Sequence, residues 1–321
     1  MKDVTTQLKP GEFNHELRKK VLIEINEDFS DAEWVNICLK SGMIEELVGC
    51  FTDDAVVIRE LASWAIMQVA LVEQGWQYII DHKIVVEVAK LFEDEDTQIR
   101  ANAYKTLINL ADFMYGIDSV IDFDINIINI LVDRLVLEVE EDIQILVQTL
   151  LKILLEGGRA QSIILTTMAH QWLNDHMTSS NAKIRELSAL ILGSISYNEW
   201  GKEVTIQADS IPIICGMLND ATSACRVAAT WALTSLSQLK SGKVQIFELE
   251  KCDRIIQLLE DDEEQTRLNV VQMIANVAEY PPAREKFQEC LPKLRELAEL
   301  KEYPLVARFA QTAVSVIVWT P

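Results

Sequence analysis

The chain has 321 residues, of which 49% are hydrophobic, with only seven prolines and eleven glycines, a composition typical of a folded helical protein rather than a disordered or collagen-like one. Fifty acidic residues against twenty-nine basic ones give a formal charge of −21. This balance argues against nucleic acid and against an acidic membrane surface as partners.

The first predicted elements, in residues 1–41, form an incomplete copy of a helical pattern that recurs along the chain. Lys20, Glu24 and Asp28 stand at positions that are apolar in later copies. Polar residues at these positions suit a terminal repeat that shows one face to water. We therefore predict that residues 1–41 are an N-terminal capping repeat.

From residue 58 onward a long amphipathic helix recurs with a period of 41 residues. In the first full copy the apolar residues follow the stripe of a helix packed on one side: Ile58, Leu61, Ala62, Ala65, Ile66 and Val69. An arginine recurs at one position of the copies, here named the arginine column: Arg18, Arg59, Arg100, Arg185, Arg226 and Arg267. Gln144 takes this column in the copy between Arg100 and Arg185. A glycine follows sixteen residues later at Gly75, Gly116, Gly201 and Gly242.

A shorter apolar element precedes each of several long helices, in residues 43–51, 84–92, 211–218, 254–260 and 291–299. A unit of about 41 residues with a short helix and then a long one is the signature of armadillo or HEAT repeats. We predict an all-α, right-handed armadillo/HEAT-like α-solenoid of about seven to eight degenerate repeats. It occupies residues 1–321 as a single repeat domain, with residues 290–321 as the C-terminal capping repeat.

Acidic residues cluster just before the long helices. An aspartate recurs six residues ahead of the arginine column as Asp53, Asp94, Asp220 and Asp261, with Ser179 at the same position. We interpret these residues as helix N-caps, because Asp and Ser accept hydrogen bonds from free backbone amides and a carboxylate favours the positive end of the helix dipole. The arginines are most simply structural and pair with acidic turns nearby.

No catalytic constellation is present in the sequence. The nucleophile-elbow, P-loop, dinucleotide and H-E-x-x-H motifs are absent, and the scattered cysteines and histidines lack metal-ligand spacing. We interpret His170 and His176 as ordinary surface histidines and the cysteines as buried thiols. The prediction is a non-enzymatic protein with no metal, cofactor or small-molecule substrate. With no signal peptide or apolar span in sight, we expect it in the cytoplasm or cytoskeleton.

Two further columns predict a ladder along the groove of the solenoid, because they lie four residues apart and off the apolar stripe. The column five residues after the arginine holds Trp64, Lys105, Leu190, Trp231 and Gln272. The column nine residues after it holds Gln68, Asn109, Ser194, Ser235 and Asn276. Indole and amide groups suit the binding of an extended peptide. The alternative, that both tryptophans only pack between neighbouring repeats, is equally open.

One resemblance is to the armadillo repeats of the nuclear-import adaptor importin alpha and of beta-catenin, carried by residues 229–242, ATWALTSLSQLKSG. The importin alpha repeats combine tryptophan and asparagine in the two groove columns. Here Trp64 is followed by Gln68 and Trp231 by Ser235, so no copy has both. This resemblance implies the alternative function, a soluble transport or assembly adaptor that binds extended peptide segments.

A second resemblance covers more of the chain. Residues 266–321 resemble the C-terminus of the radial spoke head 14 homologues, armadillo-repeat proteins of the radial spokes of motile cilia and flagella. The matching pieces are R-L-N at Arg267, V-A-E-x-P at Val277, P-x-x-R at Pro292 and the ending at Ala313, Ser315, Val316, Ile317 and Pro321. The acidic stretch RLVLEVEED at Arg134 is similar to that family's central turn.

This second resemblance implies a structural subunit of the axonemal radial spoke in a cilium or flagellum. Its partners would be other radial-spoke subunits, held by the solenoid surface. We expect the acidity of the chain to favour a basic or extended partner segment.

Overall fold

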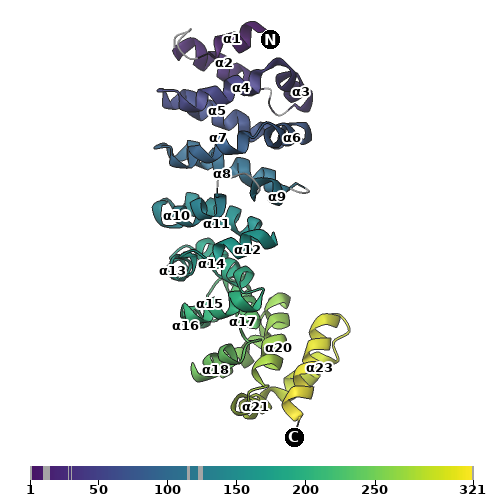
Figure 1. Ribbon diagram of the computed structural model, residues 1–321. Coiled ribbons are helices and arrows are strands. Elements are labelled where there is room, and N and C mark those ends of the chain that lie inside the picture. The colour runs from purple at the N-terminus through teal and green to yellow at the C-terminus, as the bar shows by residue number, and fades with distance from the viewer. Residues whose placement is uncertain are drawn as a thin grey trace. The chain divides into compact units, whose positions relative to one another are not determined.

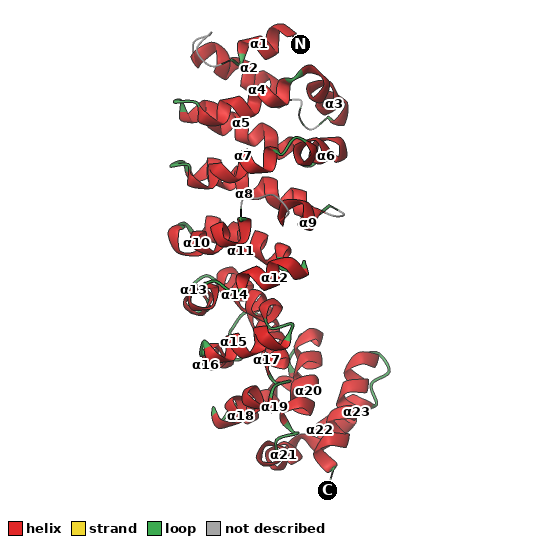
Figure 2. Cartoon of the chain, viewed as in Figure 1, coloured by secondary structure: helices red, strands yellow, loops and turns green. Residues whose placement is uncertain are grey.

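The computed structural model describes residues 2–9, 15–27, 29, 31–113, 116–121 and 126–319. Within these residues the chain consists of helices joined by turns, without a strand (Figure 2). Contacts divide it into two compact units, Met1–Ala160 and Gln161–Pro321. The all-helical class is confirmed, while the single continuous domain stays a prediction.

The first unit is a stack of short and long helices (Figure 1). Its helices are α1 (Lys2–Gln7), α2 (His15–Glu27), α3 (Ala32–Ser41), α4 (Met43–Gly49), α5 (Val56–Val69), α6 (Glu73–Asp81), α7 (Ile84–Lys90), α8 (Thr97–Ala111), α9 (Gly116–Ile121), α10 (Ile127–Leu137) and α11 (Glu141–Leu154). The short α12 (Gly158–Ile164) runs across the boundary of the units. The long helices pack in sequence order, α2 on α5, α5 on α8 and α8 on α11.

The second unit repeats this scheme. Its helices are α13 (Ala169–His176), α14 (Ala182–Ile195), α15 (Glu199–Gln207), α16 (Ser210–Met217), α17 (Ser223–Leu236), α18 (Lys240–Glu248), α19 (Cys252–Gln257), α20 (Glu264–Val277), α21 (Pro281–Phe287), α22 (Leu291–Ala298) and α23 (Pro304–Val318). Again the long helices pack in order, α14 on α17, α17 on α20 and α20 on α23. Each unit is therefore a helical repeat stack with its core between successive long helices.

The predicted apolar stripe is the core of the stack. Ile58, Ala62, Ala65, Ile66 and Val69 of α5 are all buried, and Leu61 is half-buried. In α2, by contrast, Lys20 and Glu24 are exposed as the sequence predicts for a polar first repeat, and Asp28 lies outside the described residues. Burial of the stripe against two neighbouring helices is what holds each long helix in place.

The arginine column ties each repeat to the next. Arg59 Nε lies 2.7 Å from Asp94, Arg185 Nε lies 2.7 Å from Asp220, and three more pairs follow the same scheme: Arg18–Asp53, Arg100–Glu138 and Arg226–Asp261. Nη1 of Arg59, Arg100, Arg185, Arg226 and Arg267 also donates to the backbone carbonyl six residues earlier. The prediction of structural arginines is confirmed.

The prediction that the aspartate column supplies N-caps is wrong. The N-cap lies four residues before the arginine, for example Asp96 for α8 and Asn181 for α14. Asp94 instead accepts a hydrogen bond from the backbone N–H of Asp96, which closes a tight turn. It also accepts a hydrogen bond from Arg59 of the preceding repeat. An aspartate can accept a hydrogen bond from the backbone N–H two residues later in a turn, and it can also cap a helix. The residue type alone therefore does not show which of the two roles it takes.

The glycine column has a steric cause that the sequence did not show. A Cβ at Gly75, Gly116, Gly201 or Gly242 would lie 1.8–2.1 Å from a backbone carbonyl oxygen near the end of the preceding long helix. The chain turns back so closely after each long helix that a side chain cannot be accommodated. Glycine at this column therefore permits the close approach of each long helix to the helix that follows it.

His170 corrects another prediction. It is only 4% exposed, and its Nε2 lies 3.3 Å from the hydroxyl of Thr205. Burial lowers the pKa of His170 to about 4, so the ring is neutral at pH 7. It is a core residue of the second unit rather than a surface histidine.

Candidate functional site

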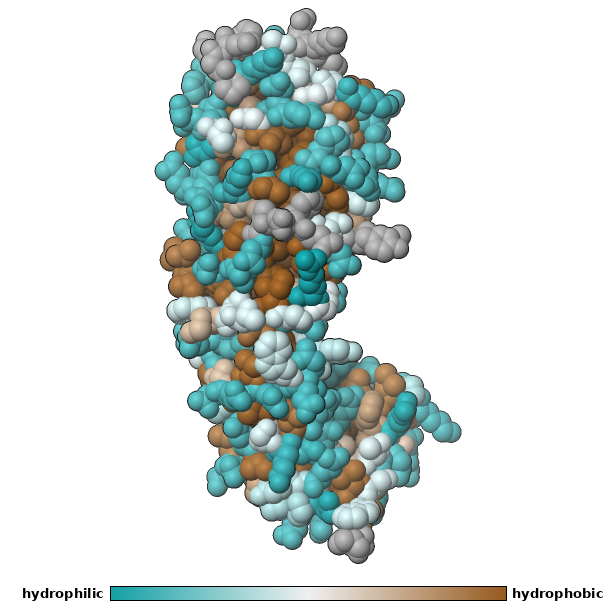
Figure 3. All heavy atoms as spheres, in the orientation of Figure 1, coloured by the Kyte–Doolittle hydropathy of each residue, from teal (hydrophilic) through white to brown (hydrophobic). Residues whose placement is uncertain are grey.

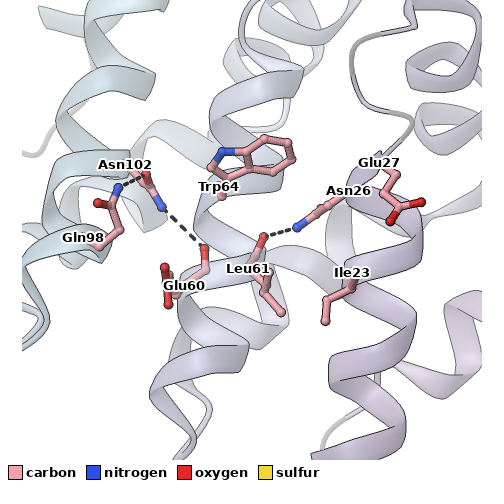
Figure 4. Close-up of a pocket in the computed structure, with 8 residues that line it drawn as sticks. All are labelled: Ile23, Asn26, Glu27, Glu60, Leu61, Trp64, Gln98 and Asn102. Carbon is pink, nitrogen blue, oxygen red and sulfur yellow. Dashed lines mark hydrogen bonds between the residues drawn. The ribbon is translucent and has the colours of Figure 1, made fainter.

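A pocket of about 540 Å³ opens on the first unit around Trp64. Three successive long helices line it: α2 with Ile23, Asn26 and Glu27, α5 with Glu60, Leu61 and Trp64, and α8 with Gln98 and Asn102. Figure 4 shows the Trp64 indole between Asn102 on one side and Asn26 on the other. The pocket thus has an apolar wall of Ile23, Leu61 and the indole, and polar groups at both ends.

Asn26 brings an unsatisfied acceptor to this pocket. Its side-chain nitrogen donates to the Leu61 carbonyl at 3.0 Å, which fixes the orientation of the amide. The residue is 8% exposed, and its Oδ1 is buried without a hydrogen-bond partner among the described residues. A buried acceptor left unpaired costs about 1–3 kcal/mol.

The remaining polar groups of the pocket are mostly acceptors. The structure shows no hydrogen bond or ion pair from the carboxylates of Glu27 and Glu60 to another described residue. Glu27 is exposed and Glu60 is half-buried. A site with two carboxylates and an aromatic wall suits a cation with an aliphatic stem, since the carboxylates accept its hydrogen bonds and the indole face favours positive charge.

Asn102 and Gln98 are site residues that the sequence analysis missed. Asn102 is buried, and its amide nitrogen donates to the Ser63 hydroxyl at 3.0 Å while its oxygen accepts from Gln98. The same arrangement recurs in the second unit, where Gln265 donates to Asn269 and Asn269 donates to the Thr230 hydroxyl. The pattern Q-x-x-x-N recurs at the same position of two repeats, and this recurrence is the sequence signal that could have identified them.

The predicted ladder residues of the first unit differ in their surroundings. Of Trp64, Gln68, Lys105 and Asn109, Trp64 is the one that lines the described pocket. Lys105 is exposed, while Gln68 and Asn109 are half-buried. The Asn109 amide nitrogen points to the Met67 carbonyl of the preceding long helix at 3.5 Å, which occupies its donor within the stack.

In the second unit two of the predicted ladder residues make contacts within the stack. The Asn276 amide nitrogen donates to the Ser237 hydroxyl at 3.0 Å and to the Thr234 carbonyl at 3.3 Å. Trp231 lies directly on Gly193, where a Cβ would meet the indole Cζ3 at 2.1 Å. The other members are half-buried: Leu190, Ser194, Ser235 and Gln272.

The two tryptophans therefore differ in environment despite their shared column. In each case one residue of the preceding repeat lies beside the indole. This residue is Gly193 for Trp231, and at the same position of its own repeat it is Asn26 for Trp64. A glycine lets the Trp231 ring close onto the helix, whereas Asn26 lines an open pocket beside Trp64. The packing interpretation fits Trp231, and the binding interpretation fits Trp64.

The described part of the chain has two further properties that concern ligands and membranes. No group of three or more His, Cys, Asp and Glu side chains there is arranged to hold a metal ion. None of the helices that the structure describes combines the length and the apolar character needed to cross a bilayer.

Comparison with known proteins shows the fold alone. No family model and no curated protein matches the sequence. A solved structure of an engineered protein from a structural genomics consortium superposes with a TM-score of 0.87 at 18% identity, over 100% of this chain and 79% of that one. A second engineered protein, at 19% identity over 86% of this chain and 98% of that one, has a TM-score of 0.46, too low to carry an argument.

Proposed function

We propose that this chain is a non-enzymatic armadillo-type repeat scaffold whose Trp64 pocket binds a segment of a partner protein. The observation that carries the proposal is the 540 Å³ pocket walled by the Trp64 indole and lined by the carboxylates of Glu27 and Glu60. A pocket of this size between successive helices of a repeat stack suits one or two side chains of a peptide.

The partner segment is basic. Lysine or arginine places an aliphatic stem along Trp64 and Leu61 and donates hydrogen bonds to Glu27 or Glu60. The formal charge of −21 draws such a segment toward the chain before contact is made. An acidic segment meets like charge on approach and finds few donors in the pocket.

We further propose, from the resemblance of residues 266–321, that the chain is a structural subunit of the radial spoke and that its partners are other spoke subunits. The protein would then reside in the axoneme of a motile cilium or flagellum. The rival proposal is a soluble armadillo-type adaptor of the importin alpha kind, which shares the helical repeats but not the attachment to the cytoskeleton.

Fractionation of ciliated cells that express the tagged chain separates these proposals. A spoke subunit stays with detergent-extracted axonemes and leaves with chaotropic salt, and Trp64→Ala reduces the retained fraction. Trp200→Ala, an exposed tryptophan of the second unit, serves as the matched control and leaves retention unchanged. A chain that washes out with detergent contradicts the spoke assignment and favours the adaptor.

A further inference from the structure

A second surface of the first unit stands out at the end of α10. Val136 is 43% exposed, Leu137 is 61% exposed and Val139 is 77% exposed. These three residues, here named the apolar tip, lie at the end of α10 and in the turn that follows it, and none of them lines the Trp64 pocket. Figure 3 shows apolar atoms on the molecular surface over α10.

The apolar tip is a departure from the chain's own repeat. At the position of Leu137 the other copies carry polar residues: Thr52, Glu93, Thr178, Asn219 and Glu260. At the position of Val139 they carry polar or small residues: Asp54, Glu95, Ser180, Ala221 and Asp262. The turn itself therefore does not require large apolar side chains here. Their exposure to water costs free energy that the other turns avoid.

The tip is held outward by its neighbours. Glu138, between Leu137 and Val139, is 3% exposed and accepts hydrogen bonds from Arg100 at 3.0 Å and from the Tyr104 hydroxyl at 3.0 Å. Gln144 fixes the Glu138 carbonyl at 2.8 Å. Glu138 is extended, with φ −81° and ψ 126°, so an inward Glu138 turns Val139 outward. The tip is thus presented in a fixed position.

Carboxylates surround the tip. Asp133 is exposed one helical turn before Leu137, and Glu140, Glu141 and Asp142 are exposed at the start of α11, with Glu140 3.4 Å from Arg100. The basic residue of α10, Arg134, is half-buried and 3.3 Å from Glu93. An apolar centre with an acidic rim is complementary to an apolar pocket with a basic rim.

We infer that the apolar tip is a docking surface for a basic, amphipathic helix of another protein. Leucine-type side chains of that helix cover Leu137 and Val139, and its lysines or arginines meet Asp133 and Glu140. A second copy of this chain is disfavoured, because a symmetric contact through the tip places the two acidic rims against each other. The surface is independent of the proposed Trp64 pocket.

The test uses a synthetic amphipathic helix of leucine and lysine as the probe, and its leucine and glutamate counterpart as the charge control, each labelled with fluorescein. Binding to the full chain is measured by fluorescence anisotropy. The key variant is Leu137→Thr with Val139→Ser, which installs the residues found at Thr178 and Ser180 in the next repeat. Leu71→Thr, at a 54% exposed leucine of the same unit, is the matched control.

We expect the lysine helix to bind the wild type and to lose about tenfold or more in affinity with the double variant, but not with Leu71→Thr or Trp64→Ala. The glutamate helix should bind about tenfold more weakly than the lysine helix. Circular dichroism checks that the double variant folds, and Val139→Ser alone replaces it if it does not.

Three results overturn the inference: no binding of the lysine helix to the wild type, equal binding to the wild type and the tip variant, or equal binding of the two helices. Sedimentation of the chain alone adds a fourth. A dimer that the tip variant abolishes would assign the surface to a second copy.

Discussion

At the scale of the residue, the molecule depends on side chains that each satisfy two neighbours. Asp220 accepts the Thr222 N–H with one oxygen and holds Arg185 with both, and Arg185 in turn binds the carbonyls of Ser179 and Ser180. The hydrogen bond from Arg185, more than any other contact, lowers the pKa of Asp220. Both side chains are largely buried, so each depends on the other for its charge to be tolerated.

Removing one member of this pair should therefore cost more than removing both. Asp220→Ser keeps an oxygen for the turn, as Ser179 does for Asn181, but leaves Arg185 unpaired. We expect the free energy of unfolding to fall by about 2 kcal/mol. Adding Arg185→Gln, the residue type that Gln144 supplies in the same column, should restore about half of this loss.

Urea unfolding and hydrogen exchange in α14 and α17 measure the effect. A double variant that is less stable than Asp220→Ser, or a single variant as stable as the wild type, would show that the arginine column holds the repeats together through something other than charge pairing.

His170 makes the stability of the second unit depend on pH. Its pKa is about 4 in the folded chain and 6.5 when unfolded, because burial disfavours the charged ring. Well above pH 6.5 the His170 ring is neutral in both the folded and the unfolded chain, so it costs no stability. As the pH falls from 6.5 to 4, the unfolded chain takes up a proton that the folded chain resists, and stability declines by up to about 3 kcal/mol.

Thermal unfolding between pH 7 and pH 4 tests this assignment. His170→Gln should flatten the decline over that range, while His82→Gln, an exposed histidine of the first unit, should leave it as steep as in the wild type. An unchanged slope in His170→Gln would place the acid sensitivity in other titratable groups.

At the scale of the element, the close approach at the glycine column sets how each repeat follows the last. Gly242 in α18 lies where a Cβ would meet the Leu236 carbonyl oxygen at 2.1 Å. A Cβ added at Gly216 in α16 would have no such atom within 4 Å. The two glycines occupy helices of one unit, Gly242 buried in the first turn of α18 and Gly216 exposed near the end of α16, so Gly216 is the control without a close contact.

Gly242→Ala should destabilise the second unit by about 3 kcal/mol, since the backbone must move to relieve the clash. Gly216→Ala should stabilise it by about 0.5–1 kcal/mol, because alanine is the better helix former and restricts the unfolded chain. Chemical denaturation of the two variants provides the comparison. Equal effects would mean that the glycine column is not a steric requirement.

The sequence was sufficient to predict the helices, the stripe and the column of structural arginines, because each follows from spacing along one helix. It misplaced the N-caps, because Asp94 faces an arginine of another repeat as well as its own turn. It missed Asn26 altogether. The role of that residue depends on the Leu61 carbonyl of the next helix and on an empty volume beside Trp64, neither of which has a sequence pattern.

At the scale of the whole molecule, the acidity separates into three uses. Part of the charge is neutralised within the arginine column, part surrounds the apolar tip, and part lines the Trp64 pocket. Both surfaces of the first unit are proposed to bind basic partners, and the net charge of −21 would favour the approach of such partners from a distance. The affinity of the chain for a basic partner should accordingly fall as the salt concentration rises.

The most direct test of the binding proposal is a titration of the Trp64 pocket with a defined peptide. The probe is the tightest lysine-containing peptide from a randomised ten-residue library selected on the wild-type chain, with its lysine-acetylated copy as the charge control. Glu27→Gln with Glu60→Gln removes the pocket carboxylates, and Glu24→Gln with Glu33→Gln makes the same change in net charge on exposed residues outside the pocket.

We predict that the pocket variant raises the Kd about tenfold or more and that the control variant changes it by no more than about twofold, as measured by fluorescence anisotropy. Acetylation of the lysine should weaken binding to the wild type by a similar factor. Equal Kd values for the two variants, or a selection that returns acidic peptides, would contradict a basic-segment scaffold built on Trp64.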